Sequence, residues 1–378
     1  MLSLHPTTHH MNYPSSTSTM HSIRLLFWLP LLLLDLAPSA QAQKFIYDVE
    51  ALSYFDNREY HGPNQRSQTI YGIRLSPTIG VAFKDSTQGR YHLVGGLHYI
   101  QPMGGNWRNI HLWPTLYIEM LRKGFSIALG AIPYTKRIDP IPAFMRYDSL
   151  AYAYPNIQGA LFQYGSKWGF AEFMCDWRGL PSPTKREMFL LLLNGQFHYK
   201  LLFTGGYAQL NHKASYGAPN HDSVCDDIFL NPYLGVDLTA YTPLDSLSLR
   251  AGYVWGMQRI RNDLPNDTFF PQGFLAGLTM RWRWVGLRTT VYYGKPLMPL
   301  YPIYGPDLNR GDPFYQSNFY SCTSLYLYLV HNRWMYCYFA WNFHLDNTHR
   351  LQHQQQLIAR FNLSRIGTKN APKLPLTI

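Results

Sequence analysis

The sequence predicts an all-β protein, a transmembrane antiparallel up-and-down β-barrel of about sixteen strands. Three observations predict this fold. After an export-type leader, no apolar run is long enough for a transmembrane helix, which leaves a soluble secreted protein or a membrane barrel. The chain has 29 Tyr, 21 Phe and 10 Trp but only 15% charged residues, which favours the barrel. The third observation is a series of alternating segments joined by connections of unequal length.

The first part of the chain resembles a targeting segment. Residues 20–24 form a short basic start, residues 25–34 are apolar except for Pro30, and residues 40–42 supply the small side chains of a cleavage point. The alternative is an anchoring helix, but the apolar run is shorter than a bilayer requires. We therefore predict a leader and signal peptide over 1–42, an outer-membrane barrel over 43–363, and a periplasmic tail over 364–378.

Charge and cysteine content limit the classes of binding partner and cofactor. The formal net charge of +11 is not concentrated in a Lys/Arg-dense motif, so nucleic acid is not indicated. A basic channel, or an acidic lipopolysaccharide neighbour in the outer membrane, fits the charge better. The four cysteines form no CxxC spacing, and we predict neither a metal nor another cofactor. An oxidising compartment would allow a disulfide to form. None is predicted, because alternation points Cys322 inward and Cys337 outward.

Segments of about ten residues carry apolar or aromatic side chains at every second position, as strands between lipid and water do. Sixteen such segments are predicted, at approximately 45–54, 69–82, 90–101, 110–121, 125–134, 158–166, 169–178, 186–198, 200–210, 228–241, 246–258, 272–284, 287–294, 319–331, 334–344 and 351–363.

The connections alternate in length. Those after even-numbered segments are mostly tight, as at 122–124 and 285–286, whereas those after odd-numbered segments are mostly long, as at 135–157 and 295–318. Outer-membrane barrels alternate short periplasmic turns with long external loops in this way. A soluble β-sandwich has no reason to sort its loops by length. With a periplasmic amino terminus, the long segments lie outside the cell.

Individual segments show two faces. In the twelfth, the apolar residues Phe274, Leu278 and Trp282 alternate with Gly277 and Arg281, so we expect the apolar set to face lipid. The eighth segment departs from this pattern, because residues 189–193 are uninterrupted apolar side chains. That passage is compatible with contact to a plug, to a loop folded inward or to a partner protein.

Several short motifs resemble a known family. The segments 55–60 and 74–80, together with Asp176-Trp177 and Arg186-Glu187, resemble a family of Bacteroides-type, porin-like outer-membrane barrels that are mostly uncharacterised. The resemblance implies the fold and the location in the cell outer membrane. It implies no reaction.

A barrel of this strand number has an interior too wide for wall side chains alone, so a water-filled lumen is expected. Four of the predicted lumen arginines lie near the periplasmic mouth with no acid among them: Arg250, Arg281, Arg283 and Arg288. We expect this arginine group to favour anionic or strongly dipolar solutes. The alternative is that they pair with carboxylates and brace the wall. The predicted pore-lining residues are Arg74, Arg250, Arg281, Arg283, Arg288 and Arg360, with Asp48, Glu50, Glu119, Glu172, Asp176 and Asp237.

Three classes of function remain at this point. The leading one is a porin-like channel for passive diffusion of small polar or anionic solutes. The second is an occluded barrel that serves as a receptor or scaffold for a protein or glycan, and a homo-oligomer is compatible with either. The third is an enzyme, for which one predicted loop offers His212, His221, Asp222, Asp226 and Asp227, but their spacing matches no catalytic motif. We therefore predict no catalytic residues and no enzyme.

Overall fold

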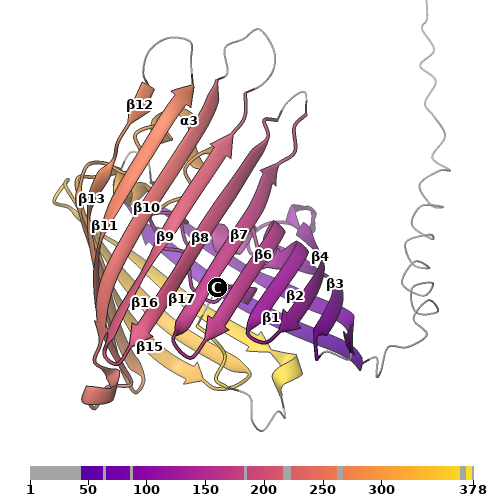
Figure 1. Cartoon of the computed structure of the whole chain (residues 1–378). Helices are drawn as coiled ribbons and strands as arrows, with labels where there is room; N and C mark the ends of the chain where they lie inside the picture. The colour runs from indigo at the N-terminus through magenta and orange to yellow at the C-terminus, as the bar shows by residue number, and fades with distance from the viewer. Residues whose placement is uncertain are drawn as a thin grey trace, which may run out of the picture.

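The computed structural model shows one closed β-barrel (Figure 1). It describes residues 44–62, 65–85, 88–182, 185–215, 223–261, 267–366 and 372–376. Seventeen strands form a single antiparallel sheet, and one of them, β12 (Asp267–Phe269), pairs only with the loop end of β11. The predicted leader lies outside the described residues.

The other strands form the wall, and each pairs with its neighbours in the chain. Their bounds are β1 Lys44–Glu59, β2 Gln68–Lys84, β3 Arg90–Pro102, β4 His111–Arg122, β5 Phe125–Pro133, β6 Asn156–Ser166, β7 Gly169–Gly179, β8 Met188–Tyr199, β9 Leu202–Lys213, β10 Val224–Asp237, β11 Ser246–Arg261, β13 Gln272–Trp282, β14 Val285–Gly294, β15 Phe319–His331, β16 Met335–Asp346 and β17 Leu351–Asn362.

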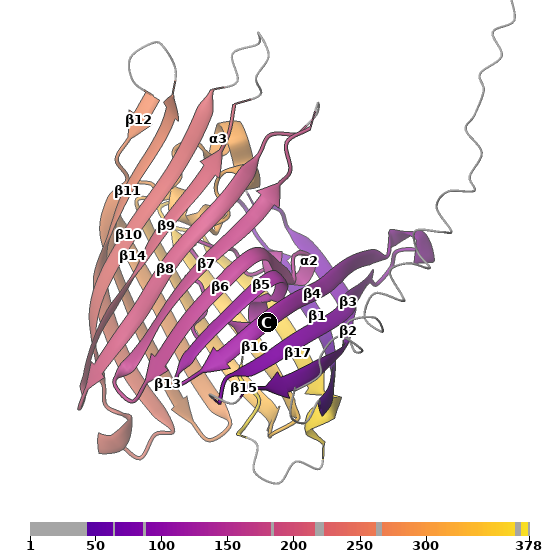
Figure 2. The ribbon, with the colours of Figure 1, turned by 45° about the vertical axis from the view of Figure 1, so that its right-hand side comes forward.

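The barrel closes between its first and last strands. Leu52 of β1 stands opposite Arg74 of β2 on one side and Arg360 of β17 on the other, and Figure 2 shows β17 beside β1. Closure pairs the edges that an open sheet would expose. The predicted all-β barrel is confirmed, and each of the sixteen predicted segments overlaps one wall strand.

Tight turns connect the strands at one end of the barrel. Between β4 and β5, Lys123 and Gly124 have φ angles of 42° and 86°, as a two-residue turn of the hairpin type requires. The opposite end carries the long connections, and β7 to β11 extend well above the neighbouring wall at that end (Figure 1). The sorting of connections by length is therefore present in the structure.

The two faces of the wall differ as the alternation predicts. Large apolar side chains such as Leu249, Phe274 and Trp282 are exposed on the outside, by 42%, 67% and 52%. Inward positions are mostly buried. On β8, Leu190 and Leu192 point inward and join the main core cluster, so the uninterrupted apolar run contacts the barrel's own contents.

Two long connections fold into the lumen and account for this core. Phe144 and Met145 of segment 134–155, and Leu297, Met298 and Phe314 of segment 295–318, pack with wall residues in one cluster. Short helices occur in these and other connections: η1 Trp107–Asn109, η2 Tyr134–Lys136, α2 Leu150–Ala153, η3 Thr239–Tyr241, α3 Tyr301–Tyr304, η4 Gly305–Asp307, η5 Pro313–Gln316 and η6 Leu363–Arg365. No helix in the described ranges is long and apolar enough to cross a membrane.

Residues 372–376, in the C-terminal tail, pack against the barrel at the tight-turn end. Leu374 donates its N–H to the carbonyl of Asn332 at 2.8 Å, and its carbonyl lies 3.0 Å from Nε2 of His331. Its side chain is buried in a cluster with Tyr336 and Tyr338. The four cysteines are unpaired, with Cys225 fully buried. The proposed domain boundaries remain a prediction.

Candidate functional site

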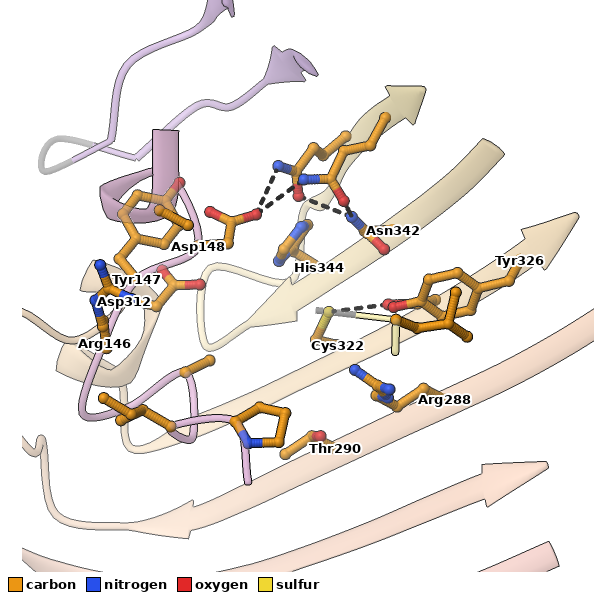
Figure 3. Close-up of a pocket in the computed structure, with 18 of the residues that line it drawn as sticks. Arg146, Tyr147, Asp148, Arg288, Thr290, Asp312, Cys322, Tyr326, Asn342 and His344 are labelled. Atoms are coloured by element: carbon orange, nitrogen blue, oxygen red, sulfur yellow. Dashed lines mark hydrogen bonds between the residues drawn. The ribbon is translucent and has the colours of Figure 1, made fainter. Parts of the chain in front are cut away.

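A cavity of about 320 Å³ lies in the lumen between β14–β17 and segment 134–151. Figure 3 shows Arg288, Tyr326 and Asn342 from the wall and Asp148 from the inward segment around the same space. The cavity therefore combines wall and loop residues that are far apart in the sequence.

Segment 134–155 is held to the wall by buried polar contacts. The guanidinium of Arg137 forms an ion pair with Glu172 at 2.6 Å and donates to Asn194 at 2.8 Å. The other carboxylate oxygen of Glu172 accepts from the N–H of Ile138, and the hydroxyl of Tyr134 donates to Asp176 at 2.7 Å. Because the side chains of these contacts, apart from that of Ile138, are buried, the segment occupies a defined place in the lumen.

The far end of the same segment contacts the barrel closure. Asp148 pairs with Arg58 of β1 at 3.2 Å and accepts from Gln354 and Gln356 of β17. Nearby, burial raises the pKa of Asp312 in segment 295–318 to about 7. The polar run at 352–356 thus forms the hydrogen-bonding surface for the inward segment.

Most of the predicted lumen residues are paired. Arg360 and Arg74 both form ion pairs with Glu50, the second at 3.7 Å. Asp48 accepts from Asn362 and Ser364, Glu119 pairs with Lys136 at 2.5 Å, and Asp237 accepts from the N–H of Thr239. With Glu172 and Asp176 bound to the inward segment, these groups fit the bracing alternative. Whether they line an open pore remains a prediction.

The predicted arginine group on neighbouring strands behaves differently. Arg250, Arg281 and Arg288 occupy inward positions, and their guanidinium groups lie over Tyr233, Tyr328 and Tyr326 at 5.5, 4.2 and 5.6 Å. None of the three forms an ion pair within the described residues. Arg283 was misplaced by alternation. It lies in the turn after β13 with φ of 52° and stacks on Trp282, because the strand ends before it.

A second group of polar residues lies on the outside of the wall. Nδ1 of His212 on β9 is 2.9 Å from Oδ1 of Asp226 on β10. Arg259 and Arg261 of β11 donate to the other carboxylate oxygen at 2.7 and 2.8 Å. The side chain of Asp226 is 2% exposed, whereas those of Arg259 and Arg261 are 37% and 49% exposed.

The outward direction of this group follows from its neighbours. Asp227 points inward, since it accepts from Gln258, which also donates to the carbonyl of Leu297 inside the barrel. Successive side chains of a strand point to opposite faces, so Asp226 faces outward. The ring of Phe189 stacks on His212 at 4.9 Å, and Trp177 stacks on Phe189 at 5.3 Å. These outward-facing residues, Trp177, Phe189, His212, Asp226, Arg259 and Arg261, are called the outer-wall group below.

The outer-wall group lies directly above the apolar surface of these strands. Leu230, Leu234 and Leu249 continue the outward face toward the tight-turn end and are all exposed. Aromatic side chains mark the interface between hydrocarbon and headgroups in membrane barrels. Trp177 and Phe189 are aromatic side chains of this kind, and their stack holds His212 beside the apolar surface.

Another outward-facing polar network lies on β17, β1 and β2. Asn57 donates to Gln355 at 2.8 Å and to Glu59 at 3.0 Å, and it accepts from Thr69 at 2.7 Å. Gln355 in turn lies 2.6 Å from Nδ1 of His353. This network contains a histidine but, among the described residues named here, no lysine or arginine, which distinguishes it from the outer-wall group.

The sequence prediction for the enzymatic alternative was partly misplaced. His212, Asp226 and Asp227 are in strands rather than in a loop, and Asp227 faces the other side of the wall. His221 and Asp222 lie outside the described residues. Arg259 and Arg261 were missed, although they follow Trp255 and Met257 at every second position, which would have placed them on the same outward face. The described ranges contain no group of His, Cys, Asp and Glu that could hold a metal ion.

The barrel is similar in fold to porin-like barrels of known structure. It resembles a loop-deletion mutant of OmpT from Vibrio cholerae, with a TM-score of 0.50, 10% identity, and coverage of 85% of this chain and 100% of that one. It also resembles OccK5 (OpdH) of Pseudomonas aeruginosa, with a TM-score of 0.50, 9% identity, and coverage of 85% and 98%. At such identities the likeness concerns the fold alone. No curated protein sequence matches the chain.

Residues 37–377 match the model of a family described as Lipid A 3'-O-deacylase-type. The chain belongs to this family. The match corrects the prediction that the protein is not an enzyme, because the family is named for a hydrolytic activity. It does not bear on the more specific Bacteroides-type resemblance. Alternation and composition identify a barrel but cannot reveal catalysis by a few residues on its surface.

Proposed function

We propose that this protein is an outer-membrane hydrolase that removes an ester-linked acyl chain from a phosphorylated glycolipid of the lipid A class. The family description names this activity. The observation that carries the proposal is the His212–Asp226 pair at 2.9 Å, flanked by two arginines on the outer wall. A lipid substrate reaches that position by lateral diffusion and does not need to enter the lumen.

The pair supplies a general base. When Nδ1 of His212 donates to the Asp226 carboxylate, Nε2 carries the lone pair. A water molecule gives its proton to Nε2 while its oxygen attacks the ester carbonyl carbon. The carbonyl electrons move to oxygen, and the oxyanion is stabilised by a guanidinium N–H. Collapse breaks the bond to the sugar oxygen, which takes the proton back from Nε2, leaving a fatty acid and a free hydroxyl.

The arginines suit the headgroup of such a substrate. Arg259 uses one N–H on Asp226 and Arg261 uses two, so each keeps further donors. Guanidinium groups bind phosphate through paired hydrogen bonds. We expect the arginines to hold a glucosamine phosphate beside the ester while the acyl chains lie against the apolar wall. Lipopolysaccharide is then the membrane partner, and residence in the outer membrane of a Gram-negative cell is part of this proposal.

The test uses full-length protein in vesicles that contain lipid A, with fatty acid release followed by mass spectrometry. His212→Ala and Asp226→Asn should each lower the rate by about 10²- to 10⁴-fold, the usual contribution of a general base. His353→Ala is the matched control, because it removes an outward-facing histidine from the other polar network. Loss of activity in His353→Ala with full activity in His212→Ala would assign catalysis to that network and refute our assignment.

Passive diffusion of small polar or anionic solutes through the lumen is a second candidate. The solvent-exposed Arg288 beside a cavity supports it, whereas the two inward segments occupy much of the cross-section. Purified protein in a planar bilayer tests this candidate. A stable open conductance would support diffusion, and a closed barrel would leave the outer wall as the functional surface.

A further inference from the structure

Arg288 is a lumen cation that pairs with no carboxylate among the described residues. It lies on β14 opposite Thr279 of β13 and Ser324 of β15. Its side chain lines the cavity and is exposed there. Within the described residues it makes no hydrogen bond or ion pair, and its closest recorded partner is the ring of Tyr326. An unpaired charge inside a protein is costly unless water or a ligand solvates it.

The neighbouring charges increase the positive potential at this place. Arg281 lies two residues along β13 from Thr279, and within the described residues its guanidinium donates only to the backbone carbonyl of Arg283. Arg250 of β11 stands opposite Gly277, and its side chain lies over the place that a side chain at Gly277 would occupy. Asp139 is close enough to interact with Arg250 but forms no ion pair with it, and its hydroxyl partner is Tyr207. Asp148 and Asp312 also line the cavity, but Asp148 pairs with Arg58 and Asp312 accepts from the N–H of Phe314. Each of these three carboxylates thus has a partner of its own, and Arg288 is the charge that an anion in the cavity would meet.

The rest of the cavity is suited to a polyhydroxylated body. Tyr326, Tyr338 and Thr290 line it, and none of their hydroxyl groups has a hydrogen-bond partner recorded in the described ranges. Aromatic faces contact the apolar face of a sugar ring, while hydroxyl groups bind its edge. The volume of about 320 Å³ is at the small end of the range for ligand cavities. It therefore suits a single ring and not a long chain.

We propose that this cavity is a binding site for a sugar-sized oxyanion, such as a uronic acid. In this site Arg288 would hold the carboxylate through paired N–H donors, and Tyr326 and Tyr338 would contact the ring. Figure 3 shows Arg288 and Tyr326 beside the same space. The site is independent of the proposed hydrolysis, because the cavity and the outer-wall group lie on opposite faces of the wall. It also differs from passive diffusion, since it retains its ligand.

The experiment is calorimetric titration of full-length protein in detergent with glucuronate, glucose and inorganic phosphate. Wild type should bind glucuronate saturably and at least tenfold more tightly than glucose or phosphate. Arg288→Gln should weaken glucuronate binding at least tenfold. Arg283→Gln, which removes the same charge from the turn outside the lumen, should leave it unchanged.

The possible results separate the proposals. Absence of saturable glucuronate binding to wild type, or equal effects of Arg288→Gln and Arg283→Gln, would overturn the lumen site. Phosphate binding as tight as glucuronate binding would overturn the sugar part of the assignment. His212→Ala should abolish lipid hydrolysis but keep glucuronate binding, and Arg288→Gln should do the reverse, so failure of one proposal is distinguishable from failure of the other.

Discussion

The anchor between Arg137 and Glu172 should control whether segment 134–155 stays in the lumen. Glu172→Gln leaves the shape of the side chain but removes its charge, so Arg137 remains buried without its ion pair. Breaking such a pair costs about 3–5 kcal/mol. At 1.4 kcal/mol for each factor of ten, the undocked population of the segment rises by roughly 100- to 5,000-fold. Because Tyr134 and Asp148 hold the same segment through other contacts, we expect transient opening and not permanent loss.

Single-channel recording in planar bilayers measures this effect. Glu172→Gln should show frequent openings that wild type lacks, with little change in the heat-dependent migration of the barrel on a gel. Asp307→Asn is the control, because it breaks an ion pair with Lys213 in which the Asp307 side chain is 61% exposed. Exposed pairs of this kind contribute less than about 1 kcal/mol to stability. Unchanged conductance together with a lower unfolding temperature in Glu172→Gln would show that the pair stabilises the wall and does not hold the segment.

Three further predictions concern pH, topology and the tail. Because burial raises the pKa of Asp312 to about 7, the free energy of unfolding should fall as pH rises from about 4 to 7. Asp312→Asn should flatten this pH dependence in unfolding titrations. A pH dependence that the substitution leaves unchanged would contradict the prediction. On a background without native cysteines, an impermeant thiol label should reach Arg108→Cys in whole cells but not Lys123→Cys; labelling at Lys123 would reverse the orientation. Leu374→Asp should free the tail for carboxypeptidase without unfolding the barrel, and continued protection would refute the docking of Leu374.

The strands could be predicted from the sequence because each needs only a local signal. A period of two, turn residues and unequal connections are all readable within a few residues, and they located every wall strand. The ends of β9 to β11 were less predictable. These strands continue past the apolar band into a polar stretch, where alternation between apolar and polar residues no longer marks a strand. His212 and Asp226 were consequently assigned to a loop.

The contents of the lumen could not be predicted, because they depend on contacts between distant residues. Arg137 meets Glu172 and Asp148 meets Gln356 only after the chain has folded back into the barrel. The one local hint was the apolar run on β8, whose inward Leu190 and Leu192 need a partner inside. Alternation placed Arg250, Arg281 and Arg288 on the inward face, but it could not show that they form no ion pair with a carboxylate among the described residues.

The docking of residues 372–376 against the barrel has a consequence for assembly. These residues follow β17, the strand whose pairing with β1 closes the wall, and they contact the β15–β16 turn. Leu374 can donate to Asn332 only when the β15–β16 turn has formed. Docking of residues 372–376 should therefore report on whether β15 and β16 have paired, and a label on Leu374 would follow that step during refolding.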